Sequence, residues 1–303
     1  MRRIAAALIV LGIAPLAAQQ PVFNSGVQLV TVPVTVTNAA RDQLITAGLD
    51  ITDFKIFEDG VAQEISLFSQ ERRAVSLCIV VDASGSMAVS NRVERGADAL
   101  RKTVMGLTEG DEVAIVRFSG KAMTVLPWTS KPDPKKLSWR VDPDPGTVAN
   151  SSIADALKVA LTEVERASNP RRVILIISDG YENASATPLS RVVRSRQQSE
   201  AALYAFGMAG PQERAPSGGP LRNILPELVG EAGGVYWNVA TPTDAEFAAM
   251  SLLSEMKYQY TLGYTPTKPF DGNYRRIKVE TTLQGLAVRH RGGYLALPTG
   301  AKP

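Results

Sequence analysis

Oxygen-bearing side chains follow two apolar runs of this sequence, and their types suit the binding of a hard metal ion. Asp82, Ser84 and Ser86 come directly after the first run, and Asp179 comes directly after the second. Carboxylate and hydroxyl oxygens are the ligands that Mg²⁺, Mn²⁺ and Ca²⁺ take in proteins. A zinc site is not indicated, because the 303 residues include one Cys and one His.

A third segment offers further hydroxyl groups for the same site. Ser151 and Ser152 come just before a helix-period pattern, and Thr147 lies a few residues earlier. Ser152 could instead form a capping box with Asp155, because a Ser at the N-cap and an acid three residues later satisfy free N–H groups at a helix start. Residue types alone leave Ser151, Ser152 and Thr147 open as alternatives for a third-loop ligand.

The segments that must position these side chains alternate between strand and helix patterns. Apolar runs with little alternation predict buried strands of a parallel sheet, whereas spacings of three and four predict amphipathic helices between them. A capping box of Thr243 and Glu246 predicts a last helix over about 244–256. The pattern predicts a doubly wound, mostly parallel α/β domain, whose ligand sites lie beyond the carboxyl ends of its strands. The predicted strands are 75–81, 113–118, 173–177 and 203–208, with 123–128 and 235–237 as weaker candidates.

Both ends of the chain are predicted to form strands without helices. Residues 22–72 include an alternating Val/Thr run and a turn at Asp59-Gly60, and residues 257–298 are predicted to form a three-stranded meander. Either end alone has too few strands for a stable sheet. We therefore expect one small β domain built from both ends, with the α/β domain, residues 74–256, inserted between them.

The start of the chain predicts export. Arg2-Arg3 precede a short apolar stretch and small residues, the pattern of a secretory signal over residues 1–18. The mature protein is then expected in the periplasm or outside the cell, with no membrane span. A formal net charge of +3 with scattered Arg pairs does not indicate nucleic-acid binding. Cys78, the single cysteine, excludes an intrachain disulfide and is predicted to be a buried thiol.

In their order along the chain, these motifs resemble the von Willebrand factor A (VWA) family, which has a Rossmann-like fold. That family has a metal-ion-dependent adhesion site built from Asp-x-Ser-x-Ser after the first strand, a Thr before a later helix and an Asp-Gly after the fourth strand. Asp82, Ser84 and Ser86 match the first element, and Asp179 matches the last. Ser151 stands where the family has its Thr, six residues before Leu157. The resemblance implies a Mg²⁺ site, with Mn²⁺ or Ca²⁺ as alternatives.

The flanks resemble one subgroup, bacterial VWA-related proteins frequent in Acidobacteria. The resemblance rests on the segments 53–60, 262–264, 274–279 and 289–294. It implies a protein-binding or adhesion module, in which the divalent cation coordinates an acidic residue of a partner protein.

Two other functions compete with this reading. A structural envelope module with a vestigial metal site is the first, because Ser151 replaces the usual Thr. A hydrolase is the second and weaker one: Ser84 lacks the Gly two residues before it that a nucleophile elbow has, and His290 lies far along the chain from it. We therefore expect a binding protein and not an enzyme.

Overall fold

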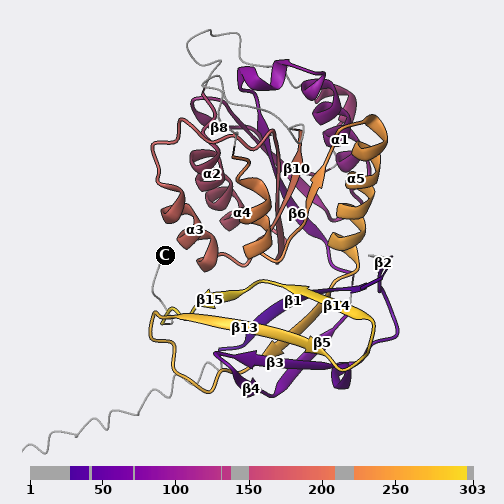
Figure 1. The fold of residues 1–303 in the computed structure, drawn as a ribbon, viewed down its shortest axis with the longest axis vertical. Helices are drawn as coiled ribbons and strands as arrows, with labels where there is room; N and C mark the ends of the chain where they lie inside the picture. Colours follow the sequence, from indigo (N-terminus) through magenta and orange to yellow (C-terminus); the bar gives the residue numbers. More distant parts are fainter. Residues whose placement is uncertain are drawn as a thin grey trace, which may run out of the picture.

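The chain folds into an α/β unit stacked on a smaller all-β unit (Figure 1). The structure is a computed structural model that describes residues 28–40, 43–70, 72–130, 132–137, 150–208 and 222–298. The predicted signal segment 1–18 and the alternative ligand Thr147 lie outside these residues.

The α/β unit is built on a six-stranded sheet with the order β11-β10-β9-β6-β7-β8. Neighbouring strands are parallel except for the edge strand β8, which is antiparallel to β7. β6 lies in the middle, and all eight of its residues are buried, as the unbroken apolar run predicts. All six predicted strands are present. They are β6 (Val75–Asp82), β7 (Glu112–Phe118), β8 (Ala122–Ser130), β9 (Arg171–Ser178), β10 (Ala202–Gly207) and β11 (Tyr236–Asn238).

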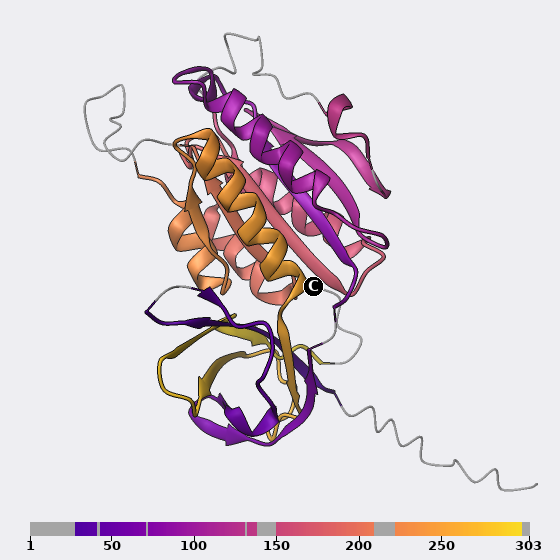
Figure 2. The same ribbon diagram turned by 90° about the vertical axis from the view of Figure 1, so that its right-hand side faces the viewer.

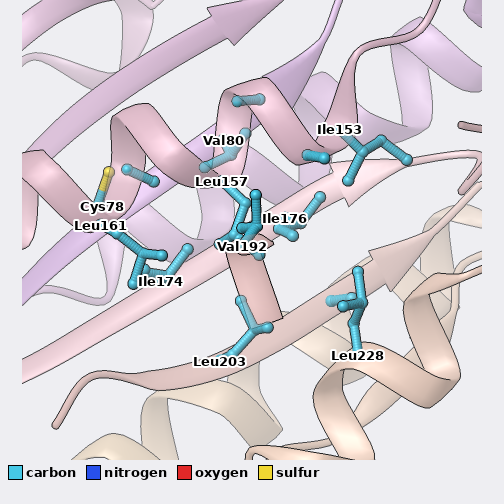
Figure 3. Packing of buried hydrophobic residues seen from close by; sticks show 14 of the residues in the cluster. Cys78, Val80, Ile153, Leu157, Leu161, Ile174, Ile176, Val192, Leu203 and Leu228 are labelled. Atoms are coloured by element: carbon cyan, nitrogen blue, oxygen red, sulfur yellow. The ribbon is translucent and has the colours of Figure 1, made fainter. Parts of the chain in front are cut away.

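Five helices cover the two faces of this sheet. α1 (Arg92–Met105) and α5 (Pro242–Lys257) pack side by side on one face, as Figure 2 shows. On the other face, α2 (Ile153–Glu165), α3 (Leu189–Gln198) and α4 (Leu225–Glu231) close a second apolar core. Figure 3 shows this second core, where Leu157 and Leu161 of α2 lie against Ile174 and Ile176 of β9. Cys78 is fully buried in it, as expected for a structural thiol.

The two ends of the chain pair with each other in the all-β unit. β1 lies between β12 and β14 and is antiparallel to both, whereas β3 pairs with β13 in a second sheet. Buried side chains from both sheets, Val32, Tyr260 and Val279 among them, form one core. The strands are β1 (Val30–Asn38), β2 (Gln43–Leu44), β3 (Phe54–Glu58), β4 (Val61–Gln63), β5 (Ile65–Ser69), β12 (Tyr260–Tyr264), β13 (Tyr274–Thr281), β14 (Leu286–His290) and β15 (Gly293–Leu295).

The prediction of a three-stranded meander at the C-terminal end is wrong. β12, β13 and β14 do not pair in succession: β12 pairs with β1 and β5, β13 pairs with β3 and β15, and β14 pairs with β1. Local turn signals cannot reveal this, because each of these strands finds its main partner near the other end of the chain. The turn at Asp59-Gly60 does form a hairpin, but it joins β3 to β4.

The last helix begins two residues earlier than predicted, at Pro242. The capping box is formed by Thr241 and Asp244, with the Thr241 hydroxyl accepting from the Asp244 N–H and Asp244 accepting from the Thr241 N–H. Glu246, which was predicted to close the box with Thr243, instead pairs with Lys102 of α1 at 2.8 Å. Among the described residues, no helix is long and apolar enough to span a membrane.

The core between α2 and the sheet predicts the cost of a cavity. Leu157 is fully buried there, so Leu157→Ala should lower the free energy of unfolding by about 2–5 kcal/mol. Urea denaturation followed by far-ultraviolet circular dichroism measures the change. Met105→Ala, at an α1 position that is 70% exposed, is the control and should change stability by less than about 0.5 kcal/mol. Equal effects of the two substitutions would contradict the packing described.

Candidate metal-ion site

Asp82 ends the central strand and is fully buried at the carboxyl edge of the sheet. Its Oδ1 accepts from the Ser84 N–H at 2.8 Å, and its Oδ2 accepts from the Ser178 hydroxyl at 2.6 Å. These bonds fix the carboxylate against the ends of β6 and β9. The position follows from the sequence, because an Asp directly after the most buried strand of a parallel sheet must lie at its carboxyl edge.

Ser84 and Ser86 lie on the turn that connects β6 to α1. Their hydroxyl oxygens are 3.0 Å apart. Ser84 precedes the short 3-10 turn Gly85–Ala88 but makes no side-chain capping bond to it. An ordinary helix cap therefore does not account for the Ser84 hydroxyl, and the two oxygens face each other beside the buried carboxylates.

Asp179 follows β9 and is also fully buried. Its charge is matched by Arg92 at the start of α1, whose Nη1 lies 3.0 Å from Asp179 Oδ2 and also donates to the Ser86 carbonyl at 2.7 Å. Arg92 is itself 2% exposed. Gly180 follows with φ +85°, and a Cβ there would collide with the Asn223 side chain, so glycine is required.

Of the two described third-loop candidates, the Ser151 hydroxyl alone is left without a partner. Ser151 is 3% exposed, and among the residues that the structure describes its Oγ has no hydrogen-bond partner. The Ser152 hydroxyl, in contrast, donates to the Ser119 carbonyl at 2.6 Å. The predicted capping box is not formed, since Ser152 makes no side-chain cap bond and Asp155 accepts from the Ala186 and Thr187 N–H groups.

Backbone hydrogen bonds hold the loops at one edge of the sheet. Ala83, next to Asp82, donates to the Phe118 carbonyl at 2.7 Å, and Ser152 donates to the Ser119 carbonyl at 3.0 Å. The end of β7 thus holds both the loop after β6 and the start of α2. The Ser151 carbonyl accepts from the Asn183 N–H at 3.1 Å, which ties the same segment to the loop after Asp179.

The two carboxylates make this edge electrostatically costly. Burial raises the pKa of Asp82 to about 7, and the neighbouring Asp179 adds to the rise. Burial also raises the pKa of Asp179, although the Ser86 hydroxyl and Arg92 act in the opposite direction. When both carboxylates are ionised, they and the one guanidinium leave one net negative charge in a dry environment. A cation would stabilise that charge and favour the ionised form of Asp82.

The donor set fits a hard divalent ion with few charged ligands. Among the described residues, no three His, Cys, Asp or Glu side chains gather at a possible metal site. The charged donors here are the two carboxylates, so further ligands would come from hydroxyls and water, as Mg²⁺ accepts. The unpartnered, buried Ser151 hydroxyl is the observation that an ordinary turn leaves unexplained.

Sequence reasoning missed the residues that support this edge. Arg92 lies in a helix-period segment that also holds exposed charges, so nothing in the pattern marks it as buried. Glu182 accepts from the Ala154 N–H at 2.8 Å and from the Ser185 hydroxyl at 2.8 Å, and Asn183 accepts from the Ser151 N–H at 2.7 Å. The sequence signal that could have revealed this support is the acid Glu182 and the amide Asn183, which come shortly after Asp179-Gly180.

His290 has a structural position. Its Nε2 accepts from the Val279 N–H at 3.0 Å, and its Nδ1 donates to the Arg291 carbonyl at 2.8 Å. Burial lowers its pKa. It belongs to the all-β unit, so it does not act as a base for Ser84.

An open, mostly parallel sheet with oxygen-bearing side chains after its first strand, β6, and its fourth strand, β9, defines a class of α/β binding domains. The profile of the von Willebrand factor type A domain matches residues 76–245. This match covers more than half of the chain, and the chain therefore belongs to the von Willebrand factor type A domain family.

Known proteins resemble the chain at low identity. An uncharacterized protein of Borreliella burgdorferi is 24% identical over 193 residues, a match that covers 57% of this chain and 56% of that protein. The chain thus aligns with little more than half the length of this relative. Proximal thread matrix protein 1 of the mussel byssus aligns with a TM-score of 0.51 at 15% identity, over 66% of this chain and 51% of that one. A von Willebrand factor type A protein from Catenulispora acidiphila aligns over 90% of this chain and 75% of its own, at 13% identity and a TM-score of 0.48.

Removing the Arg92 guanidinium from its buried ion pair with Asp179 is expected to lower the stability of the protein strongly. Arg92→Met leaves Asp179 without its partner, so in EDTA the free energy of unfolding should fall by about 3–5 kcal/mol. Arg101→Met, on the exposed side of the same helix, should cost less than about 1 kcal/mol. Urea denaturation of both variants measures the difference. In Arg92→Met/Asp179→Asn the loss should be much smaller than the sum of the single losses, and additive losses would show that the pair is not coupled.

Proposed function

We propose that this chain binds a divalent cation and presents it to an acidic side chain of a partner protein. The ligands are Asp82, Ser84, Ser86, Ser151 and Asp179, some of them through water. The buried, unpartnered Ser151 hydroxyl carries the proposal, because it lies on a loop that hydrogen bonds hold beside both carboxylate loops.

The donors indicate the class of cation, a hard divalent ion. Hydroxyl and carboxylate oxygens favour Mg²⁺, with Mn²⁺ or Ca²⁺ as alternatives. Hydroxyl ligands are neutral and leave the ion strongly electrophilic. A divalent cation beside Asp82, Asp179 and Arg92 also changes the net charge of the edge from one negative to one positive. A carboxylate from a partner would then both complete the coordination shell and neutralise the site.

The family and the sequence of the flanks support a binding role outside the cytoplasm. Domains of this family commonly serve adhesion or protein interaction. We propose that residues 1–18 are removed on export and that the mature chain works in the periplasm or outside the cell. In the proposed division, segments 22–72 and 257–298 form one carrier domain for the binding domain 74–256. A structural envelope module with a vestigial metal site is the competing function.

A cation titration tests the metal site. Mg²⁺ and Mn²⁺ should raise the melting temperature of the parent protein, whereas Asp179→Ala and Ser151→Ala should lose most of that rise because each removes a ligand. Ser152→Ala is the matched control: it loses the bond to Ser119 and some stability, but it should keep the response to cations.

The outcome of this titration separates a working metal site from a vestigial one and tests which residue is the third-loop ligand. No rise in the parent protein would favour the vestigial-site function. A rise that persists in Ser151→Ala but disappears in Thr147→Ala would move the third-loop ligand to Thr147.

Partner binding should depend on the ion. The protein, immobilised with Mg²⁺, should retain proteins from an envelope extract that EDTA releases, and Asp179→Ala should retain none of them. An acidic-to-amide substitution in a retained partner should abolish its binding. Recovery of the same proteins in EDTA would contradict ion-bridged binding.

A further inference from the structure

A polar cleft, separate from the proposed cation site, lies between the α/β unit and the all-β unit. One wall contains the starts of β9 and β10, and the other contains residues of β1 and β12. The cavity has a volume of about 270 Å³. Arg171 opens β9 and Asp179 follows its end, so the cleft lies at the opposite edge of the sheet, roughly 26 Å away along the strand.

The cleft is strongly basic. Arg73, Arg171 and Arg172 line it, and Glu200 is the one acid among the described residues of its lining. The Thr31 hydroxyl donates weakly to Glu200 at 3.5 Å. Burial lowers the pKa of Arg171, and the charge of Arg73 adds to the decrease. Positive charges thus lie close together and partly desolvated, an arrangement that an anion would stabilise.

Two guanidinium groups at this interface have buried N–H donors without an acceptor. The Nε of Arg172 is buried and has no hydrogen-bond partner. The same holds for the Nε of Arg291, which lines a small pocket that shares Pro33 and Gln259 with the cleft. A buried donor left without an acceptor is costly, and a charged one more so. Both therefore point to an acceptor outside the described residues.

Neutral polar groups complete the lining. Arg171 Nη2 donates to Gln259 Oε1 at 2.6 Å, which fixes that guanidinium at the interface. The hydroxyls of Thr31 and Thr261 belong to the opposite wall. Guanidinium groups on one wall and hydroxyls on the other are donors that phosphate and carboxylate oxygens accept.

We propose that this cleft is a binding site for a small multivalent oxyanion, of the phosphate or polycarboxylate class. Arg171 and Arg172 supply the charged donors, and Thr31 and Thr261 supply hydroxyls from the other wall. Since the two walls belong to different units, the bound anion links them. The site shares no residue with the proposed cation site, so either can fail without the other.

Calorimetric titration tests the proposal on the full chain. Inorganic phosphate and citrate are the two probes, and metal ions and chelator are both removed by dialysis beforehand so that neither contributes. At least one probe should bind saturably, and Arg172→Gln should weaken that binding about tenfold or more through loss of a charged donor. Arg194→Gln, exposed on α3, is the matched control and should bind as the parent does.

A second variant keeps the test decisive if Arg172→Gln unfolds. Glu200→Gln removes the acid from an exposed position of the lining, so it should tighten binding of the same probe severalfold. Which probe binds distinguishes a phosphate site from a carboxylate site. Absence of saturable heat with both probes would overturn the proposal, and so would equal affinities in the parent, Arg172→Gln and Glu200→Gln.

Discussion

The structure depends on how two buried carboxylates at one sheet edge are compensated. Asp82 and Asp179 are both fully buried, at the ends of adjacent strands β6 and β9. Carboxylates in such a place are stable only with hydrogen bonds and positive charge nearby. Ser178, Ser84 and Ser86 provide hydrogen bonds, and Arg92 provides one charge. The negative charge that remains explains why an added divalent cation would stabilise this edge.

The same constraint organises the surrounding loops. Ser151 must be buried and close to the other loops to contribute an oxygen, and backbone bonds from Ser152 to Ser119 and from Asn183 to Ser151 hold it there. The all-β unit lies at the other edge of the sheet, and its two halves come from opposite ends of the chain. One edge of the central sheet therefore carries the buried oxygen donors, whereas the other edge lies against the all-β unit and the basic cleft.

Sequence patterns predicted the α/β unit well because its signals are local. Each buried strand is a continuous apolar run, and Asp82 and Asp179 each follow such a run directly. The all-β unit was predicted less well, since partners such as β1 and β12 are separated by more than 200 residues and no local pattern pairs them. In the site, ligand candidates are recognisable from residue type, but the choice between Ser151 and Ser152 depends on which hydroxyl finds a carbonyl. That difference in hydrogen bonding between Ser151 and Ser152 becomes visible with the fold, as does the burial of Arg92.

Anomalous diffraction from crystals grown with Mn²⁺ tests the central claim most directly. Mn²⁺ takes the same oxygen ligands as Mg²⁺ and can be located by its own scattering. We expect one strong peak at the carboxyl edge of the sheet. The hydroxyls of Ser84, Ser86 and Ser151 should surround it. The carboxylates of Asp82 and Asp179 should bind the ion directly or through water. A map without a peak among these side chains, at Mn²⁺ concentrations that saturate any thermal shift, would contradict it.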